Sequence, residues 1–226
     1  MTGPHPEKKK RKPWIAVCIL ICLLAAGAAM LRYQHTSAKR PKDRSSGEIR
    51  QTVSATDVDG DGIDDQTDIL EGALRYVSAC PKYESRYYAG GYPDDGFGVC
   101  TDLAAAALKD AGYDLMLLVS EDIRLHPDRY AEEARDRSID FRRVRNLRVY
   151  FAFNAVSLTT DLTATEQWQG GDIVIFEAHI GIVSDRRNKN GVPYVIHHSG
   201  PWQWAYEQDI LEKRKDIVGH YRMAGS

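Results

Sequence analysis

The chain has 226 residues, of which 43% are hydrophobic, enough for one globular domain of ordinary size together with accessory segments. Its charges are unevenly spread: residues 1–32 contain six basic side chains and one acidic side chain, whereas the remainder has an excess of acidic residues. An acidic body without a basic patch argues against nucleic acid as a partner.

The N-terminal segment predicts a membrane-spanning helix. A basic cluster at residues 8–12 precedes an uncharged apolar run from Trp14 to Leu31, which is at the lower limit of length for crossing a bilayer. Basic residues before such a helix stay on the cytoplasmic side. We therefore expect a cytoplasmic segment at residues 1–13, a single-pass signal anchor in the cell membrane at residues 14–31, and an extracytoplasmic remainder. The small residues Ala26-Gly-Ala28 leave the alternative of a cleaved signal peptide and a secreted protein.

Two polar segments follow the apolar run. Residues 32–56 are rich in Lys, Arg, Ser and Thr and have no apolar period, so we expect a flexible linker. Residues 57–68 place Asp at loop positions one, three, five and twelve and Gly at position six, which is the pattern of an EF-hand calcium loop. Aspartate at position twelve is similar to the calcium loops of dockerin modules. The predicted ligands are Asp57, Asp59, Asp61, Ile63, Asp65 and Asp68.

One loop of this kind suits a structural calcium clip rather than a calcium sensor, because a sensor needs a second element with two states. The alternative is an acidic linker or a cluster of Asp-Gly turns without a bound ion.

The rest of the chain alternates helical and strand patterns. Helices are predicted at residues 69–77, from Cys100 to a left-handed cap at Gly112, at 115–123 and at 146–153, with a charged surface excursion at 127–138. Short apolar strands are predicted at residues 172–176, 179–183, 194–197 and 218–221, and residues 188–191 have the composition of a hairpin turn. Helices first and antiparallel strands afterwards predict an α+β domain.

Cys100 is the strongest candidate for catalysis. A glycine-rich loop delivers it to the first turn of a predicted helix, where the helix dipole and free backbone N–H groups favour the reactive thiolate. The hairpin brings His179 near His197 on the neighbouring strand. We expect His179 to act as the base and His197 to orient it, while backbone N–H groups at Thr101 stabilise the oxyanion.

Each of these residues has an alternative role. Cys100 can form a disulfide with Cys80 in an oxidising compartment. The histidines can be ordinary core residues, or zinc ligands together with Cys100, although adjacent residues of a strand such as His197 and His198 point to opposite faces. His198 is accordingly expected only at the rim of the site.

Several motifs resemble known families. Tyr87-x-x-Gly-Gly, Trp168-Gln-Gly-Gly-Asp-Ile-Val-Ile-Phe, His179-Ile-Gly-Ile-Val and Val195-Ile-His resemble the successive motifs of the NlpC-type papain-like cysteine peptidases. Gly98-Val-Cys-Thr-Asp-Leu, Asp140-Phe-Arg-Arg-Val-Arg-Asn-Leu and Ile217-Val-Gly-His-Tyr-Arg, with the run from His179 to Arg187, more closely resemble the bacterial domain of unknown function 1287.

The resemblance implies a papain-like α+β core over residues 69–226, with helices packed on an antiparallel sheet, and amide hydrolysis without a catalytic cofactor. It implies that Cys100, His179 and His197 are nucleophile, base and orienter, and that Tyr87 lies near the thiol. Two functions are therefore expected. One is a membrane-anchored extracytoplasmic cysteine hydrolase acting on peptidoglycan stem peptides, and the other is a non-catalytic, calcium-stabilised domain that binds cell wall or a partner.

Overall fold

The computed structural model describes residues 13–46, 49–131 and 134–223, and the chain divides into two units at residues 33 and 34. The first unit contains helix α1 (Pro13–Arg32). Its stretch Trp14–Arg32 has a mean hydropathy of 2.6 and is long and apolar enough to cross a membrane. One such N-terminal helix fits a membrane anchor or a signal sequence. The predicted cytoplasmic segment lies, except for Pro13, outside the described residues.

The second unit is built on a six-stranded sheet in the order β3-β8-β4-β5-β6-β7, in which all neighbours are antiparallel. The strands are β3 (Val156–Ser157), β4 (Ile173–Phe176), β5 (His179–Arg187), β6 (Pro193–Ile196), β7 (Glu207–Gln208) and β8 (Ile217–Arg222). The four longer strands and the hairpin between β5 and β6 confirm the sequence prediction. The edge strands β3 and β7 were not predicted, because each has only two residues, which is too short to show an apolar pattern.

The helices of this unit are α2 (Asp65–Ser78), α3 (Cys100–Asp110), α4 (Leu115–Leu125), α5 (Arg137–Asp140) and α6 (Val144–Asn154), with single turns η1 (Pro127–Arg129), η2 (Thr165–Gln167) and η3 (Leu211–Lys213). Helix α2 begins earlier than predicted because the side chain of Asp64 caps it by accepting from the backbone N–H of Thr67. Helix α6 begins two residues earlier than predicted, and Arg143 occupies its N-cap position. Gly112 follows α3 with a φ of 83°, as predicted for a left-handed cap.

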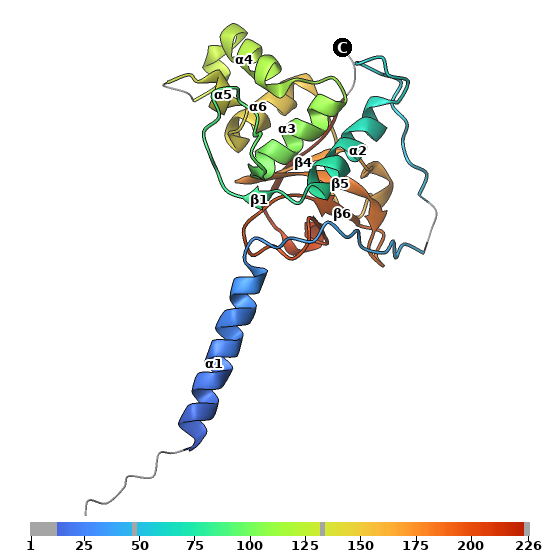
Figure 1. The fold of residues 1–226 in the computed structure, drawn as a ribbon. Coiled ribbons are helices and arrows are strands. Elements are labelled where there is room, and N and C mark those ends of the chain that lie inside the picture. Colours follow the sequence, from blue (N-terminus) through green and yellow to red (C-terminus); the bar gives the residue numbers. More distant parts are fainter. Residues whose placement is uncertain (1–12, 47–48, 132–133, 224–226) are drawn as a thin grey trace, which may run out of the picture. The chain divides into compact units, whose positions relative to one another are not determined.

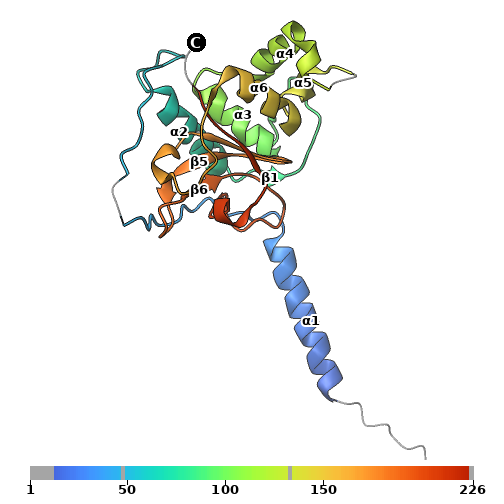
Figure 2. The same ribbon diagram turned by 180° about the vertical axis from the view of Figure 1, so that it is seen from behind.

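Helices α2 and α3 lie side by side on one face of the sheet, and α4, α5 and α6 gather beyond them (Figures 1 and 2). The two helices approach closely at Gly72, where a Cβ would lie 2.9 Å from the carbonyl oxygen of Ala107. Strand alternation sends Ile173 and Ile175 into this larger core and Val174 into a smaller core on the opposite face, around Trp168. Both faces of the central strands are therefore covered, and the α+β prediction is confirmed.

A small parallel pair of strands, β1 (Lys82–Tyr83) and β2 (Phe97–Gly98), brackets the loop that leads to Cys100. This loop carries Tyr87 and the Gly90-Gly91 pair. The pairing places β2 directly before α3, so the chain enters the first turn of that helix from an anchored strand.

The segment predicted as a flexible linker lies along the domain over its described residues 34–46 and 49–56, on the side of β6 (Figure 1). Arg40 forms ion pairs with Asp185 and Glu207. The side-chain amide of Gln51 donates to the carbonyl of Gly170 over 2.9 Å. The described part of this segment is therefore held on the domain and is not the flexible linker that was predicted. Its contacts join polar groups that are distant in sequence, and the search for apolar periodicity does not reveal such contacts.

Candidate active site

Cys100 is the first residue of α3, and its entry into the helix is held by Asp102. One carboxylate oxygen of Asp102 accepts from the backbone N–H of Val99 over 2.8 Å. Arg142 binds the same carboxylate through two hydrogen bonds of 2.6 and 3.0 Å, and also donates to the carbonyl of Arg86 over 2.6 Å. A buried arginine therefore ties the start of α3 to the loop that precedes it.

The Cys100 thiol is only 8% exposed and belongs to the larger core. Burial raises its pKa to about 11, although backbone N–H groups of Ile180 and Thr101 hydrogen-bond to it and oppose the rise. The prediction that the helix N-terminus favours the thiolate is therefore corrected. Loss of hydration raises the pKa of the thiol by more than the helix N-terminus lowers it. The contact with Ile180 nevertheless places the sulfur beside β5, one residue from His179.

The structure brings His179 and His197 together in a buried pair. Nε2 of His179 lies 2.9 Å from Nδ1 of His197, and the rings meet edge to face. Gly181 on β5 lies next to His197, where a Cβ would stand 2.5 Å from Cγ1 of Val195 and 3.2 Å from Cβ of His197. Glycine at this position therefore allows the two segments to approach closely beside the histidine pair.

Gln208 on β7 determines which ring nitrogens carry protons. Its side-chain oxygen lies 3.0 Å from Nε2 of His197, so this nitrogen is the donor and Nδ1 is left as an acceptor. The orientation of the Gln208 amide follows from Gln203, whose nitrogen faces the same oxygen at 3.5 Å. Gln203 is itself fixed, because its oxygen accepts from the backbone N–H of Ser199 and its nitrogen donates to the carbonyl of His197.

The consequence for His179 is a defined tautomer. Because Nδ1 of His197 accepts, Nε2 of His179 must donate to it, and Nδ1 of His179 keeps a lone pair. Burial lowers the pKa of His179 to about 4 and that of His197 to about 3, so both rings are neutral near pH 7. Among the described residues, no hydrogen bond joins the Cys100 sulfur to either ring.

His198 lies on the opposite face of the strand from His197, buried among aromatic rings instead of at the rim. Its Nδ1 is 3.3 Å from the hydroxyl of Tyr76, and its ring meets Tyr83 edge to face at 5.1 Å. Its Nε2 is buried without a hydrogen-bond partner in the described structure. The expected rim contact is therefore corrected: His198 is part of the core on the helix side of the sheet.

The other predicted site residues, Tyr87 and Thr101, and the alternative disulfide partner Cys80 differ in their burial. Tyr87 is 61% exposed and, together with Val99, lines a pocket of about 180 Å³ at the start of α3. Thr101 is buried and its hydroxyl oxygen has no partner among the described residues. Cys80 is exposed, and both it and Cys100 are free thiols.

The carboxylates of the predicted calcium loop do not all point the same way. One oxygen atom from each of Asp57, Asp59 and Asp61 lies within 4.8 Å of the others. Asp65 points inward, where it accepts from the backbone N–H of Val58 over 2.8 Å and from the hydroxyl of Tyr113. Asp65 is therefore corrected from a predicted ligand to a structural residue.

Asp68 is buried in the first turn of α2. Burial and the negative charges of Asp61 and Asp59 raise its pKa to about 6. In the described structure, its carboxyl group is not among those whose oxygens lie within 4.8 Å of one another.

Gln208 and Gln203 are the site residues that sequence reasoning missed, because glutamine at these positions belongs to no motif with a chemical signature. Asp172 accepts from the backbone N–H of Gln169 over 2.8 Å. It also binds His220 over 2.9 Å and Arg222 over 2.7 Å in a buried cluster away from the thiol. This cluster supports the sheet between β4 and β8.

Comparisons with known proteins agree with the motifs at this site. The family described as "Domain of unknown function (DUF1287)" matches residues 70–223. The chain is 35% identical over 167 residues to the uncharacterized protein YijF of Escherichia coli (strain K12). This alignment covers 68% of this chain and 80% of that protein. No solved structure matches the chain. The chain therefore belongs to the DUF1287 family.

Proposed function

We propose that this protein is a membrane-anchored, extracytoplasmic cysteine hydrolase that cleaves an amide bond in peptidoglycan stem peptides. The observation that carries the proposal is the contact between the Cys100 sulfur and the backbone N–H of Ile180, next to a buried His179–His197 pair of defined tautomer. The motif resemblance to NlpC-type papain-like peptidases supports the same assignment. Helix α1 supports an anchor that holds the domain next to cell wall.

In the proposed reaction, Cys100 and His179 start as a neutral thiol and a neutral imidazole. As the sulfur attacks the carbonyl carbon, its proton passes to Nδ1 of His179, a C–S bond forms and the carbonyl electrons move to oxygen. Backbone N–H groups in the first turn of α3 donate to that oxyanion. His179 then returns the proton to the departing amine, which breaks the C–N bond and leaves a thioester. Water then attacks the thioester carbon while His179 takes a proton from it. The C–S bond breaks, the carboxylic acid product leaves, and His179 returns the proton to the Cys100 sulfur.

The proposal also assigns a place for the substrate. The pocket lined by Tyr87 and Val99 adjoins the residue before the nucleophile. A peptide in this pocket would exclude water from the start of α3 and bring its carbonyl to the N–H groups there. A bound carbonyl held close to the sulfur would lower the barrier to attack by a thiol that is buried and has a high pKa in the free protein.

The test is digestion of purified peptidoglycan by the full chain in nonionic detergent under reducing conditions, with new termini identified by mass spectrometry. We expect Cys100→Ala to abolish release of peptide fragments, while the matched variant Cys80→Ala retains it because Cys80 is exposed and outside the core. Undiminished release by a folded Cys100→Ala protein would sink the proposal.

A second candidate function is a non-catalytic domain that binds cell-wall peptides or a protein partner. It is favoured by the buried, high-pKa state of Cys100 and by the missing hydrogen bond to His179 among the described residues. The rate at which a thiol-directed probe labels Cys100 distinguishes the two functions, measured in a Cys80→Ala background. If the protein is an enzyme, His179→Ala should slow this labelling, whereas His198→Ala, which also removes a buried ring, should not. If the protein is a binding domain, the Cys80→Ala protein and the two histidine variants made in it should be labelled at the same rate.

A further inference from the structure

We propose that one turn of the domain docks on the lipid surface of the membrane that α1 enters. Trp202 and Trp204 on this tryptophan turn, residues 200–204, are 58% and 65% exposed. Exposed aromatic side chains that gather on one turn indicate an interaction surface, and tryptophan is enriched where a membrane meets water. Docking rests on the membrane anchor of the proposed function and is independent of its hydrolase chemistry.

The tryptophan turn is held in shape by Gln203, which lies between the two exposed residues and is only 8% exposed. Its side-chain oxygen accepts from the backbone N–H of Ser199 over 2.7 Å. Its side-chain nitrogen donates to the carbonyls of His197 and Ala205 over 2.8 and 2.9 Å. The backbone of the turn is therefore fixed before any partner binds, and docking would pay little for ordering it.

Backbone hydrogen bonds join the tryptophan turn to the residues that directly follow the anchor. The N–H of Gln34 donates to the carbonyl of Pro201 over 2.8 Å, and the N–H of Ser37 donates to the carbonyl of Trp204 over 3.0 Å. Helix α1 ends at Arg32. Since one residue spans at most about 3.6 Å, Gln34 lies within about 7 Å of Arg32, whatever the direction of the helix. The turn is therefore held where the chain leaves the bilayer, which selects lipid as its partner.

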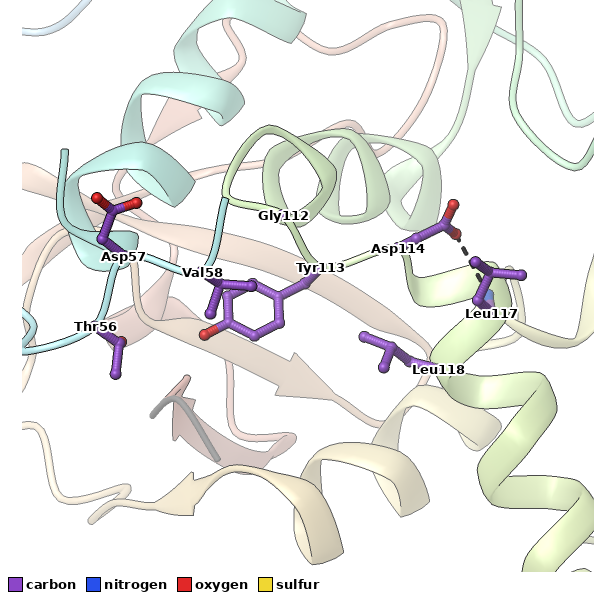
Figure 3. Close-up of a pocket in the computed structure, with 8 residues that line it drawn as sticks. All are labelled: Thr56, Asp57, Val58, Gly112, Tyr113, Asp114, Leu117 and Leu118. Carbon is purple, nitrogen blue, oxygen red and sulfur yellow. Dashed lines mark hydrogen bonds between the residues drawn. The ribbon is translucent and has the colours of Figure 1, made fainter. Parts of the chain in front are cut away.

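The segment that follows the anchor is fastened to the domain, so it is not a loose tether. The side-chain amide of Gln34 donates to the carbonyl of Tyr83 over 2.9 Å and accepts from the N–H of that residue over 2.7 Å. At the far end of the segment, Val58 lies against Gly112, where a Cβ would stand 3.0 Å from Cγ1 of Val58, and beside Tyr113 (Figure 3). Moving the tryptophan turn away from the membrane would require these contacts to break.

The charges beside the turn suit lipid headgroups. Lys39 is exposed, and its backbone N–H donates to the hydroxyl of Ser37 over 3.1 Å. Lys82 is also exposed, and it lines a cavity of about 480 Å³ together with Gln34. Ammonium groups at this level attract the phosphates of anionic lipids.

Docking would also hold the proposed active site close to the membrane. Tyr83 on β1, which Gln34 binds, pairs with Gly98 on β2, and α3 begins with Cys100 two residues later. The contacts that fix the tryptophan turn therefore lead directly to the nucleophile. The proposed hydrolase would act on peptides next to the membrane surface.

The experiment is quenching of tryptophan fluorescence in the full chain, reconstituted into vesicles of phosphatidylcholine and phosphatidylglycerol. The chain has four tryptophans, and in Trp14→Phe the emission comes from Trp202, Trp204 and the fully buried Trp168. We expect lipids with bromine atoms near the headgroup to quench this emission. The water-soluble quencher acrylamide should be several-fold less effective than it is on an exposed control position.

The matched control moves the emission to another exposed aromatic position. It combines Phe153→Trp with Trp14→Phe, Trp202→Phe and Trp204→Phe. Phe153 is 60% exposed and lies on α6, away from the segment that follows the anchor (Figures 1 and 2). Acrylamide should quench this control strongly, and brominated lipid should leave it unchanged.

A third variant, Trp202→Phe with Trp204→Phe, keeps Trp14 in the membrane helix and tests the anchor itself. If brominated lipid quenches Trp14 while only acrylamide quenches the tryptophan turn, docking is overturned and the anchor stands. If brominated lipid does not quench Trp14, the anchor fails and docking fails with it. Protection of the turn from acrylamide only after soluble peptidoglycan fragments are added would identify a glycan-binding surface and overturn docking on lipid.

Discussion

His179 and His197 share a buried hydrogen bond in which Nε2 of the first ring lies 2.9 Å from Nδ1 of the second. The direction of this bond is set two side chains away, because Gln203 orients Gln208 and Gln208 accepts from Nε2 of His197. The outcome is a lone pair on Nδ1 of His179, the state required of a general base. Gln208 is thus a positioning residue for the proposed reaction.

We expect Gln208→Leu to lower the rate of peptide release on the order of tenfold, because His197 can then adopt either tautomer. Gln208→Glu should retain most of the activity, since a carboxylate accepts the same proton. Its negative charge would also stabilise the protonated rings, raise the pKa of the histidine pair and move the acidic limb of the pH–rate profile to higher pH. The measurement is the pH–rate profile of each variant.

If Gln208 had only a structural role, Gln208→Glu would not move the acidic limb of the pH–rate profile. The control is Gln167→Leu, which removes an exposed amide elsewhere in the domain. If Gln208→Leu matches this control in both rate and pH profile, the tautomer assignment is wrong.

Three buried neutral histidines should make stability depend on pH. Burial lowers the pKa of His179 to about 4, of His197 to about 3 and of His198 to about 4, whereas an unfolded histidine titrates near 6.5. Between about pH 6.5 and 4 the unfolded chain therefore binds more protons, so the free energy of unfolding falls as the pH is lowered. The stabilisation is fully present above about pH 6.5, and the loss is up to about 1.4 kcal/mol per pH unit for each histidine.

Urea denaturation at a series of pH values from 4 to 8 measures this dependence. The double variant His179→Gln with His197→Gln should show a shallower loss over the same window. Asp172 does not confuse the result, because hydrogen bonds from His220 and Arg222 outweigh burial and hold its pKa below the usual value. Its stabilising contribution is lost only at lower pH. A stability that rises on acidification from pH 6.5 to 4 would contradict the prediction.

Local pattern was sufficient to predict the scaffold. Short apolar runs predicted β4, β5, β6 and β8, and a turn sequence predicted the hairpin that brings His179 to His197. The position of Cys100 at the start of α3 followed from the glycine-rich loop before it and the apolar period after it. These features depend on neighbours in sequence, so the chain itself reveals them.

The parts that escaped prediction depend on partners that are distant in sequence. Nothing near Cys100 shows that the core would bury the thiol and raise its pKa above that of an exposed cysteine. Asp65 fits the calcium spacing as well as Asp61 does, and only the hydroxyl of Tyr113 reveals that it turns inward. Gln208 likewise gains its role from a ring eleven residues away.

The segment before the calcium loop should contribute to stability through Arg40. Glu207 is buried and is held by Arg40 over 2.8 Å and by Ser184. Burial alone would lower the pKa of Arg40, but hydrogen bonds to Glu207 and Asp185 outweigh it and raise the pKa. We expect Arg40→Ala to lower the free energy of unfolding by about 2–4 kcal/mol, because a buried carboxylate loses its partner.

The matched control is Lys42→Ala, which removes an exposed cation from the same segment. It should change the free energy of unfolding by less than about 0.5 kcal/mol. Chemical denaturation of the two variants and the parent gives the comparison. Equal stability of Arg40→Ala and Lys42→Ala would mean that the segment does not support the domain.

The ion pair between Asp102 and Arg142 should hold both the nucleophile's helix and the loop that carries Tyr87. The two side chains are 0% and 6% exposed, and Arg142 also binds the carbonyl of Arg86 over 2.6 Å. Arg142→Met keeps the length of the side chain but leaves the carboxylate of Asp102 without its cation. We expect the free energy of unfolding to fall by about 3–5 kcal/mol, as for other broken buried pairs.

Limited trypsin digestion separates the effect on the loop from the effect on overall stability. With its carbonyl released, Arg86 should become the earliest cleavage site in Arg142→Met, because cleavage requires the backbone there to open. Arg148→Met removes an exposed arginine from the same helical region and should be cut as slowly as the parent. If the double variant Asp102→Asn with Arg142→Met is destabilised by the sum of the two single effects, the residues are not coupled and the ion pair does not hold the loop.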